Sequence, residues 1–359
     1  MQLLPQAARR RPVAGTFQGF SMKRLLSRLA VALAVAAGTA SLAQQAQAQS
    51  EPTIKLGYAK CAHCTPLVLV PEYAKGAKVE AIGFNTGNDV LTALISKSID
   101  VAQVTYLHYA TALDKGFDVV AISGQVEGGS QIVVQNDLAV KENDWDGLKA
   151  LIAKYKADGK PFRVAASRGN AQDIHMRGAF AKHGIDVNKD VQFINIPNPS
   201  DHIQALRRGE VELICTVEPF ATQIVQANAA KLFAYPYDQA AGNLTNLMLT
   251  RSDVVAANPK GLQATVKAIV DIDNKIAADK PLWVSVITKV TGLDKAIAEG
   301  AINNLVPDYK MYRKEAVAIA TMMKDLKYIT NDVSAQVEKN MDYQFLEAAT
   351  GKPKADLGY

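Results

Sequence analysis

The chain has 359 residues, of which 48% are hydrophobic and 21% are charged, and its formal net charge at pH 7 is +5. Six of its 40 basic residues, and none of its acidic residues, precede residue 49. The remainder therefore has 34 basic against 35 acidic residues, a net charge of −1. A chain without a basic excess is not expected to bind nucleic acid or anionic lipid.

The first 48 residues have the pattern of a targeting segment. Met22–Arg28 is basic, Leu29–Ala40 is apolar, and Ala46–Ala48 fits a small-x-small cleavage site. The apolar run is shorter than the ~20 residues that span a bilayer. We therefore predict a signal peptide with an N-terminal extension over residues 1–48, followed by a soluble periplasmic protein.

Strand and helix patterns alternate from Thr53 to about Ser123. This alternation favours a mostly parallel sheet with helices on its faces. The expected strands are 54–58, 79–84, 99–104 and 119–123, and the expected helices are 66–73, 90–96 and 107–115.

The pattern changes after Ser123. Residues 124–130 interrupt it, and a strand over 131–135 opens a second α/β segment. A short strand is expected at 244–250, and the chain beyond Asn258 is expected to be mainly helical. If the chain begins one lobe, forms a second lobe and then returns to complete the first, it crosses between the lobes twice. The predicted lobe 1 is residues 51–124 plus 246–359, and lobe 2 is residues 125–245.

Two stretches of the chain repeat one pattern. Residues 89–103 align with 201–215 at an offset of 112, and the strand-like segments 79–84 and 191–196 share that offset. The strands at 54–58 and 162–166 repeat at an offset of 108. A repeat of this length is too long for a solenoid. It predicts two α/β lobes with a cleft between them.

In open α/β sheets, ligands bind beyond the carboxyl ends of the strands. The repeat identifies six such loops, at 59–65, 85–88, 105–108, 167–171, 197–200 and 216–219. The candidate ligand-binding residues in and near these loops are Lys60, Cys61, His63, Asn85, Asn88, Tyr106, His108, Gln125, Ser167, Arg168, Gly169, Asn170 and Glu218.

The loop Ser167–Asn170 lies between an expected strand and an expected helix. Gly169 allows a close backbone approach, and N–H groups at a helix start favour an anion. We expect the backbone N–H groups of Gly169 and Asn170 to meet the ligand, with Lys60 or Arg168 supplying the opposite charge. A tight strand-to-helix turn with an ordinary cap is the alternative interpretation of the same residues.

Other polar residues near the cleft have two interpretations each. Tyr106 and His108 either contact a small ligand or pack between helix and sheet. Glu218 either accepts from a cationic group of the ligand or forms an ion pair between the lobes. The remaining histidines are expected at the surface: His175, His183 and His202.

Cys61-Ala-His-Cys64 is the most unusual tetrapeptide of the chain. Two thiolates and an imidazole are good zinc ligands, but a closed zinc site needs a fourth ligand, and no second Cys/His cluster supplies it. A redox Cys-x-x-Cys is the next alternative, although a thioredoxin-like pattern does not surround it. We expect a pocket loop to which Lys60 and His63 contribute polar contacts, with the thiols free or joined as a disulfide, and neither metal nor cofactor.

At these residues the chain resembles the nitrate/sulfonate/taurine-type substrate-binding proteins of ABC importers, over nearly all of the mature chain. The family's usual Trp-Glu-Pro appears here as Val217–Pro219, and its strand–Gly/Ser–helix element appears as Ser167–Asn170. The resemblance implies an α/β, two-lobe periplasmic-binding-protein fold of type II, with the ligand in the cleft. The segments that carry it are Ile54–Tyr58, Thr65–Val68, Leu94–Val101, Val164–Gly169, Ala205–Val211 and Thr216–Pro219.

The resemblance also implies a function. The expected protein is a monomeric, non-enzymatic component of an ABC importer. It binds a small polar or anionic organic solute, such as a sulfonate, a carboxylate or a nitrate-like ion, by hinge closure and delivers it to a permease in the inner membrane.

The alternative is a pyrimidine-precursor-binding protein, or a pyrimidine-synthase-like enzyme that uses Cys61, His63 and Cys64. Relatives with this fold concentrate Cys and His near a pocket. The export signal argues against a biosynthetic role in the cytosol, and the missing fourth ligand argues against a metal enzyme.

Overall fold

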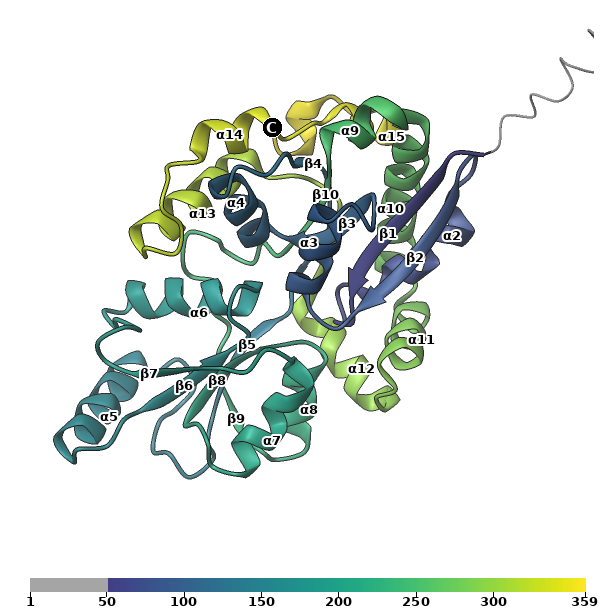
Figure 1. The fold of residues 1–359 in the computed structure, drawn as a ribbon. Helices are drawn as coiled ribbons and strands as arrows, with labels where there is room; N and C mark the ends of the chain where they lie inside the picture. Colours follow the sequence, from purple (N-terminus) through teal and green to yellow (C-terminus); the bar gives the residue numbers. More distant parts are fainter. Residues whose placement is uncertain (1–50) are drawn as a thin grey trace, which may run out of the picture. The chain divides into compact units, whose positions relative to one another are not determined.

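The computed structural model describes residues 51–359 (Figure 1), so the expected signal peptide at 1–48 lies outside the described residues. Within that range the strands form two sheets, ordered β11-β4-β10-β3-β1-β2 and β7-β6-β8-β5-β9. The strands of the first sheet are β1 (Thr53–Ala59), β2 (Lys78–Phe84), β3 (Val101–Thr105), β4 (Val120–Gly128), β10 (Asn246–Thr250) and β11 (Leu305–Asp308). Those of the second are β5 (Ser130–Val134), β6 (Arg163–Ala166), β7 (Gln192–Asn195), β8 (Leu213–Val217) and β9 (Lys231–Ala234).

Helices surround both sheets (Figure 1). Those between the strands of the second sheet are α5 (Trp145–Ala157), α6 (Ala171–Lys182), η2 (Pro199–Asp201), α7 (His202–Arg207) and α8 (Phe220–Gln226). The others are η1 (Thr65–Leu69), α2 (Val70–Tyr73), α3 (Gly87–Ile95), α4 (Tyr106–Asp114), α9 (Ser252–Ala257), α10 (Pro259–Ala278), α11 (Lys280–Thr291), α12 (Lys295–Ala301), η3 (Ile302–Asn304), α13 (Arg313–Asp325), α14 (Ser334–Lys339), α15 (Gln344–Thr350) and η4 (Lys354–Leu357).

The repeated sequence pattern corresponds to a repeated strand order. The order β2-β1-β3-β10-β4 of the first sheet matches β7-β6-β8-β5-β9 of the second. In each sheet the first three strands are parallel, and the next two pairings are antiparallel. Both sheets are therefore mixed rather than mostly parallel throughout, because β10 and β5 run against their neighbours.

The second sheet shows how strand residues build two separate cores. Side chains of successive strand residues point to opposite faces of a sheet. On β6, Val164 and Ala166 pack in one cluster with α5 and α6, while Ala165 packs in another with α7 and α8. The alternation produces a layer of helices on each face of the second sheet.

The long helix α10 supports the first sheet and contacts β1, β4, β11 and α15. Asn258 caps it by accepting from the N–H of Gly261 at 3.0 Å, and Pro259 occupies the first turn, where its missing N–H costs nothing. Buried apolar residues recur along it at helical spacing, including Leu262, Val266 and Ile269.

The chain passes between the sheets at two crossings. The first is Gly128–Gly129, where both residues have positive φ angles of 90° and 91°. The expected interruption at 124–130 is wrong over 124–128, because β4 continues to Gly128 by pairing with β11, a short strand that the sequence pattern did not reveal. The second crossing runs from β9 to β10. Gly128 N–H donates to Asn243 O at 2.8 Å, which ties the two crossings together.

His175 of α6 also connects the crossings. Its Nδ1 lies 2.8 Å from Ser130 Oγ, and its Nε2 lies 3.0 Å from Leu244 O. His175 and His202 are buried rather than at the surface, because each bonds backbone or hydroxyl groups that would otherwise be unsatisfied.

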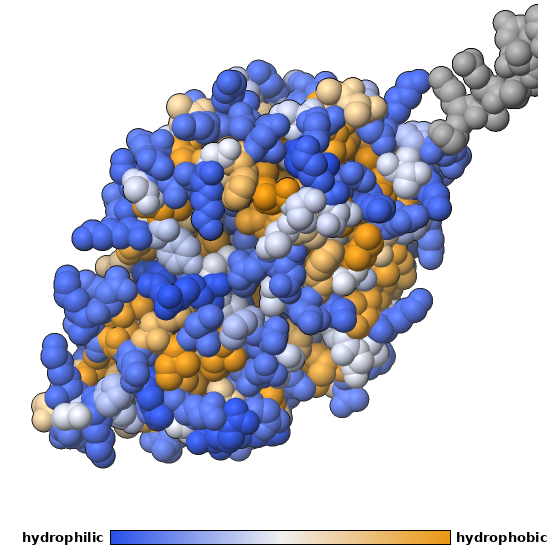
Figure 2. All heavy atoms as spheres, in the orientation of Figure 1, coloured by the Kyte–Doolittle hydropathy of each residue, from blue (hydrophilic) through white to orange (hydrophobic). Residues whose placement is uncertain are grey.

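Hydrophilic residues cover most of the face shown in Figure 2, with smaller hydrophobic patches between them. Among the helices of residues 51–359, none combines the length and the apolar character that a membrane crossing requires.

Candidate functional site

A cavity of about 350 Å³ lies where the loops of the two sheets meet. Its size falls within the range of small-molecule sites. The lining comes from the loops after β1, β2 and β3 of the first sheet and after β6, β7 and β8 of the second, together with the end of α11. The lining residues are Ala59, Lys60, Cys61, His63, Cys64, Asn85, Thr86, Gly87, Gln103, Thr105, Asn170, Ala171, Gln172, Asn198, Pro199, Ser200, Val217, Phe220, Val290 and Thr291.

The cavity carries a positive charge. Among the described residues that line it, Lys60 is the only lysine or arginine, and no carboxylate is present. Lys60 directly follows β1, and its N–H donates to Phe84 O at 3.1 Å. Burial, and to a smaller degree the nearby His175, lower the pKa of His63 to about 3, so its imidazole is neutral at pH 7. The net charge of the lining is that of Lys60 and favours an anionic ligand.

Helix N-termini add to this field. Three lining residues are N-caps: Thr86 of α3, Thr105 of α4 and Asn170 of α6. The N-terminus of a helix carries a partial positive charge and N–H groups that lack partners inside the helix. Thr86 and Thr105 cap the first turns of their own helices, whereas Asn170 makes no side-chain cap bond. The start of α6 is therefore the end best able to donate to a ligand.

One acidic residue, Asp173, occupies the first turn of α6 but is already paired. Its Oδ1 accepts from Arg177 Nε at 2.7 Å, and its Oδ2 accepts from Tyr328 OH at 2.7 Å and from Gly169 N–H at 3.2 Å. It does not line the cavity. Because the Asp173 carboxylate is already paired, it reduces the positive field at the start of α6 but does not reverse it.

The loops of the two sheets contact each other beside the cavity. Asn88 Nδ2 donates to Arg168 O at 3.0 Å, and Asn88 Oδ1 lies 3.1 Å from His108 Nε2. Thr105 N–H donates to His108 Nδ1, so Nε2 carries the proton and donates to Asn88. A side chain at Gly87 would approach Asn170 Oδ1 to 2.8 Å, so glycine permits this close packing.

The structure brings five of the predicted site residues to the cavity wall, and they are Lys60, Cys61, His63, Asn85 and Asn170. The other eight do not line it, and they are Asn88, Tyr106, His108, Gln125, Ser167, Arg168, Gly169 and Glu218. Most of these eight hold the lining loops in place.

Several of the eight have clear structural partners. Tyr106 is 2% exposed, and its OH accepts from Tyr312 N–H at 3.3 Å. Gln125 Oε1 accepts from Asn246 Nδ2 on β10 at 2.7 Å. Ser167 Oγ donates to Pro197 O at 2.6 Å, which fixes the loop after β6 against the loop after β7. The Arg168 guanidinium lies 4.9 Å from the centre of a phenylalanine ring on β7.

Gly169 serves the turn rather than the cavity wall. Its φ angle is 85°, a conformation that favours glycine, and a Cβ there would meet Asn88 Oδ1 at 3.0 Å. Its N–H donates to Asp173, so it is not free for a ligand. The sequence predicted a close approach of the Gly169 backbone to a ligand. In the structure this backbone lies close to Asn88 instead.

Glu218 connects the loop after β8 to the first sheet. Its backbone oxygen accepts from Ala62 N–H at 2.9 Å. Its carboxylate accepts from Thr222 N–H at 3.0 Å and from Gln131 Nε2. Among residues 51–359 it forms no ion pair. Burial raises its pKa to about 7.

Five lining residues fall outside the predicted loops, and they are Gln103, Gln172, Phe220, Val290 and Thr291. Gln103 lies inside β3, where its Oε1 accepts from Ala59 N–H at 3.1 Å. A buried amide in the apolar strand Val101–Thr105 was a usable signal, since buried polar side chains need partners. Val290 and Thr291 come from α11, and nothing in the local sequence indicates that this helix end reaches the cavity.

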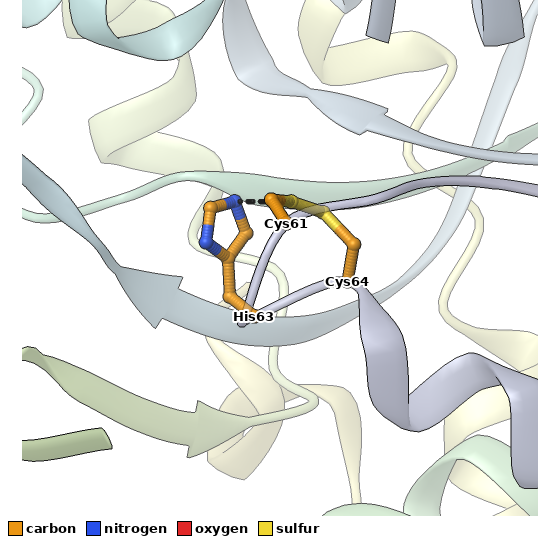
Figure 3. A group of neighbouring side chains, drawn as sticks. All are labelled: Cys61, His63 and Cys64. Atoms are coloured by element: carbon orange, nitrogen blue, oxygen red, sulfur yellow. Dashed lines mark hydrogen bonds between the residues drawn. A yellow bond between two sulfur atoms is a disulfide. The ribbon is translucent and has the colours of Figure 1, made fainter. Parts of the chain in front are cut away.

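Cys61 and Cys64 form a disulfide at the cavity wall, and the His63 ring lies beside it (Figure 3). His63 Nε2 is 3.1 Å from Cys61 Sγ. The oxidised pair is one of the two states that the sequence left open. Cys215 is a free, buried thiol on β8.

Two mixed sheets whose strand ends enclose one cavity are the architecture of periplasmic binding proteins. The periplasmic nitrate-binding protein NrtA from Synechocystis PCC 6803 matches with a TM-score of 0.72 at 20% identity, over 85% of this chain and 90% of that one. The alkanesulfonate-binding protein SsuA from Xanthomonas axonopodis pv. citri, bound to MOPS, matches with a TM-score of 0.66 at 18% identity, over 80% of this chain and 98% of that one.

The chain belongs to the NMT1-like family, which matches residues 47–281. The nitrate/nitrite binding protein NrtA of Synechococcus elongatus is 27% identical over 149 residues, which are 41% of this chain and 33% of that protein. The chain spans about a third to a half of the length of the curated relatives it matches. The resemblance to nitrate- and sulfonate-type substrate-binding proteins is thereby confirmed.

Proposed function

We propose that this chain is the exported solute-binding component of an ABC importer and that it carries a small organic anion to a membrane permease. The observation that supports this most directly is the cavity charge. Lys60 faces the same cavity as the uncapped start of α6, and no carboxylate lines it among the described residues. Relatives named for nitrate and alkanesulfonate are consistent with an anionic ligand.

The apolar part of the lining suits an organic rather than a purely inorganic anion. Val217, Phe220 and Val290 contribute apolar side chains to the same cavity. Contact with an apolar group contributes roughly 25 cal/mol per Å² of surface removed from water. A carboxylate or sulfonate with a short apolar portion would use both halves of the lining.

The proposed mechanism is closure of two lobes, one built on each sheet, about the crossings at Gly128–Gly129 and β9–β10. Because β4 reaches Gly128, residues 125–128 go with the predicted lobe 1 (51–124 plus 246–359) rather than with lobe 2 (125–245). The contact of Asn88 with Arg168 and that of Ala62 with Glu218 are made between the two sheets' loops. A ligand that touches both loop sets binds the closed arrangement better than the open one, and so shifts the population towards it. No step of this mechanism requires catalysis.

A thermal-shift screen tests the proposal. The mature protein would be heated with sulfonates, carboxylates, nitrate, bicarbonate, amino acids, pyrimidines and organic cations. A ligand at a hundred times its Kd stabilises the native state by about 2.7 kcal/mol. We expect anions to raise the melting temperature, with an organic anion above nitrate. A screen in which only cations or uncharged solutes stabilise the protein would refute the proposal.

A further inference from the structure

The Cys61–Cys64 loop carries chemistry that solute binding does not use. One donor atom each from Cys61, His63 and Cys64 lies within 4.8 Å of the others. The three residues are 8%, 3% and 1% exposed, and Figure 3 shows the imidazole beside the two sulfurs. Two sulfurs and one imidazole nitrogen at this spacing are a donor set for a soft metal ion.

The His63 ring is positioned without a hydrogen bond at its other nitrogen. Nδ1 is buried and has no hydrogen-bond partner among the described residues. It lies 2.7 Å from where a Cβ of Gly129 would be, so packing against this glycine sets the ring orientation. The result is that Nε2 is directed at Cys61 Sγ, 3.1 Å away.

The loop is held in place by more than its disulfide. Ala62 N–H donates to Glu218 O at 2.9 Å, and Ala62 O accepts from Trp283 Nε1 at 3.2 Å and from Thr65 Oγ1 at 3.0 Å. These bonds do not involve sulfur. Opening the disulfide therefore leaves the three donors close together, which lowers the entropy cost of binding an ion.

We propose that reduction of the Cys61–Cys64 disulfide converts this loop into a binding site for Cu(I). A dithiol reductant supplies two electrons and two protons. The S–S bond breaks, two thiols form, and the reductant becomes a disulfide. Cu(I) then displaces the thiol protons and is bound by two thiolate sulfurs and His63 Nε2. Two soft thiolates and one imidazole, a ligand that copper also accepts, suit three-coordinate Cu(I), whereas a structural zinc site takes four ligands.

The test compares oxidised and reduced mature protein under anaerobic conditions. The disulfide would be reduced with a water-soluble phosphine, which becomes a phosphine oxide, and the protein would be desalted and titrated with Cu(I) against a chromophoric chelator. We expect one Cu(I) per reduced chain and none in the oxidised chain, with X-ray absorption showing two sulfurs and one nitrogen. Cys64→Ser and His63→Gln should lose this binding.

Cys215→Ser is the matched control, because it removes a buried thiol outside the loop and should keep the binding. His63→Gln retains the disulfide, so its folding can be checked in the oxidised form by circular dichroism. The proposal is wrong if reduced wild-type protein takes up no more Cu(I) than Cys64→Ser. It is also wrong if the reduced loop prefers zinc, or if His63→Gln binds Cu(I) as the wild type does.

Discussion

Replacing Lys60 by glutamine removes the positive side chain of the cavity while keeping a similar length and hydrogen-bonding capacity. A hydrogen bond to a charged partner contributes about 1.5–3 kcal/mol, and each 1.4 kcal/mol changes Kd about tenfold. Lys60 is exposed, so solvent and salt screen its charge, and the lower end of that range applies. We therefore expect Lys60→Gln to weaken binding of the stabilising anion by roughly tenfold.

Lys55→Gln is the matched control. Lys55 lies on β1, the strand that Lys60 directly follows, and it is also exposed but does not line the cavity. The control variant therefore makes the same change in net charge away from the cavity. Isothermal titration calorimetry of both variants at low and high salt separates a local contact from a long-range field. Equal weakening in the two variants, or none in Lys60→Gln, would show that Lys60 does not contact the anion.

Three further predictions concern the loop contacts and the buried titratable groups. Asn88→Ala should weaken ligand binding about two- to tenfold, because it removes the hydrogen bond to Arg168 O. Unchanged binding by calorimetry would show that this hydrogen bond does not stabilise the closed, ligand-bound arrangement. Burial raises the folded-state pKa of Glu218 from 4.5 to about 7. The wild type should therefore lose about 3 kcal/mol of stability as pH rises from 4.5 to 7. Urea unfolding should show Glu218→Gln gaining stability relative to the wild type over that window, and a gain that is equal at pH 4 and pH 8 would refute this. Burial lowers the pKa of His175 and of His202 to about 4. As pH falls from 6.5 to 4, these histidines are protonated in the unfolded state before they are protonated in the folded state, so the protein should lose stability. His202→Gln should make this loss smaller in urea unfolding. A loss as large as that of the wild type would contradict the prediction.

The loops of the cavity could be predicted because the pattern repeat is a local property of the chain. Strand and helix periods at 79–105 and 191–217 are set by nearby residues, and parallel strands bring their carboxyl ends to one edge. The strand-to-helix turn at Ser167–Asn170 and the Cys61–Cys64 loop could be found in the same way. Lys60 was identified because it directly follows a strand of the repeat.

Which side chains face the cavity was decided only by the tertiary structure. Gly169 and Asn170 are adjacent in the loop, yet Asn170 lines the cavity, while the Gly169 N–H is used by Asp173. His108 was expected at the ligand but supports Asn88, which holds the loop at Arg168. These outcomes depend on how closely two loops 80 residues apart approach each other, and local sequence does not encode that distance.

The sequence by itself determined the two α/β segments and the six loops, because each follows from the spacing and type of neighbouring residues. It also determined the near balance of charge beyond residue 48, which is a matter of composition alone. The tertiary structure decided the rest. It added β11 to the edge of β4, buried His175 between the two crossings, and brought the end of α11 to the cavity. These features arise from packing between segments far apart in the chain, where the partner rather than the local sequence sets the position.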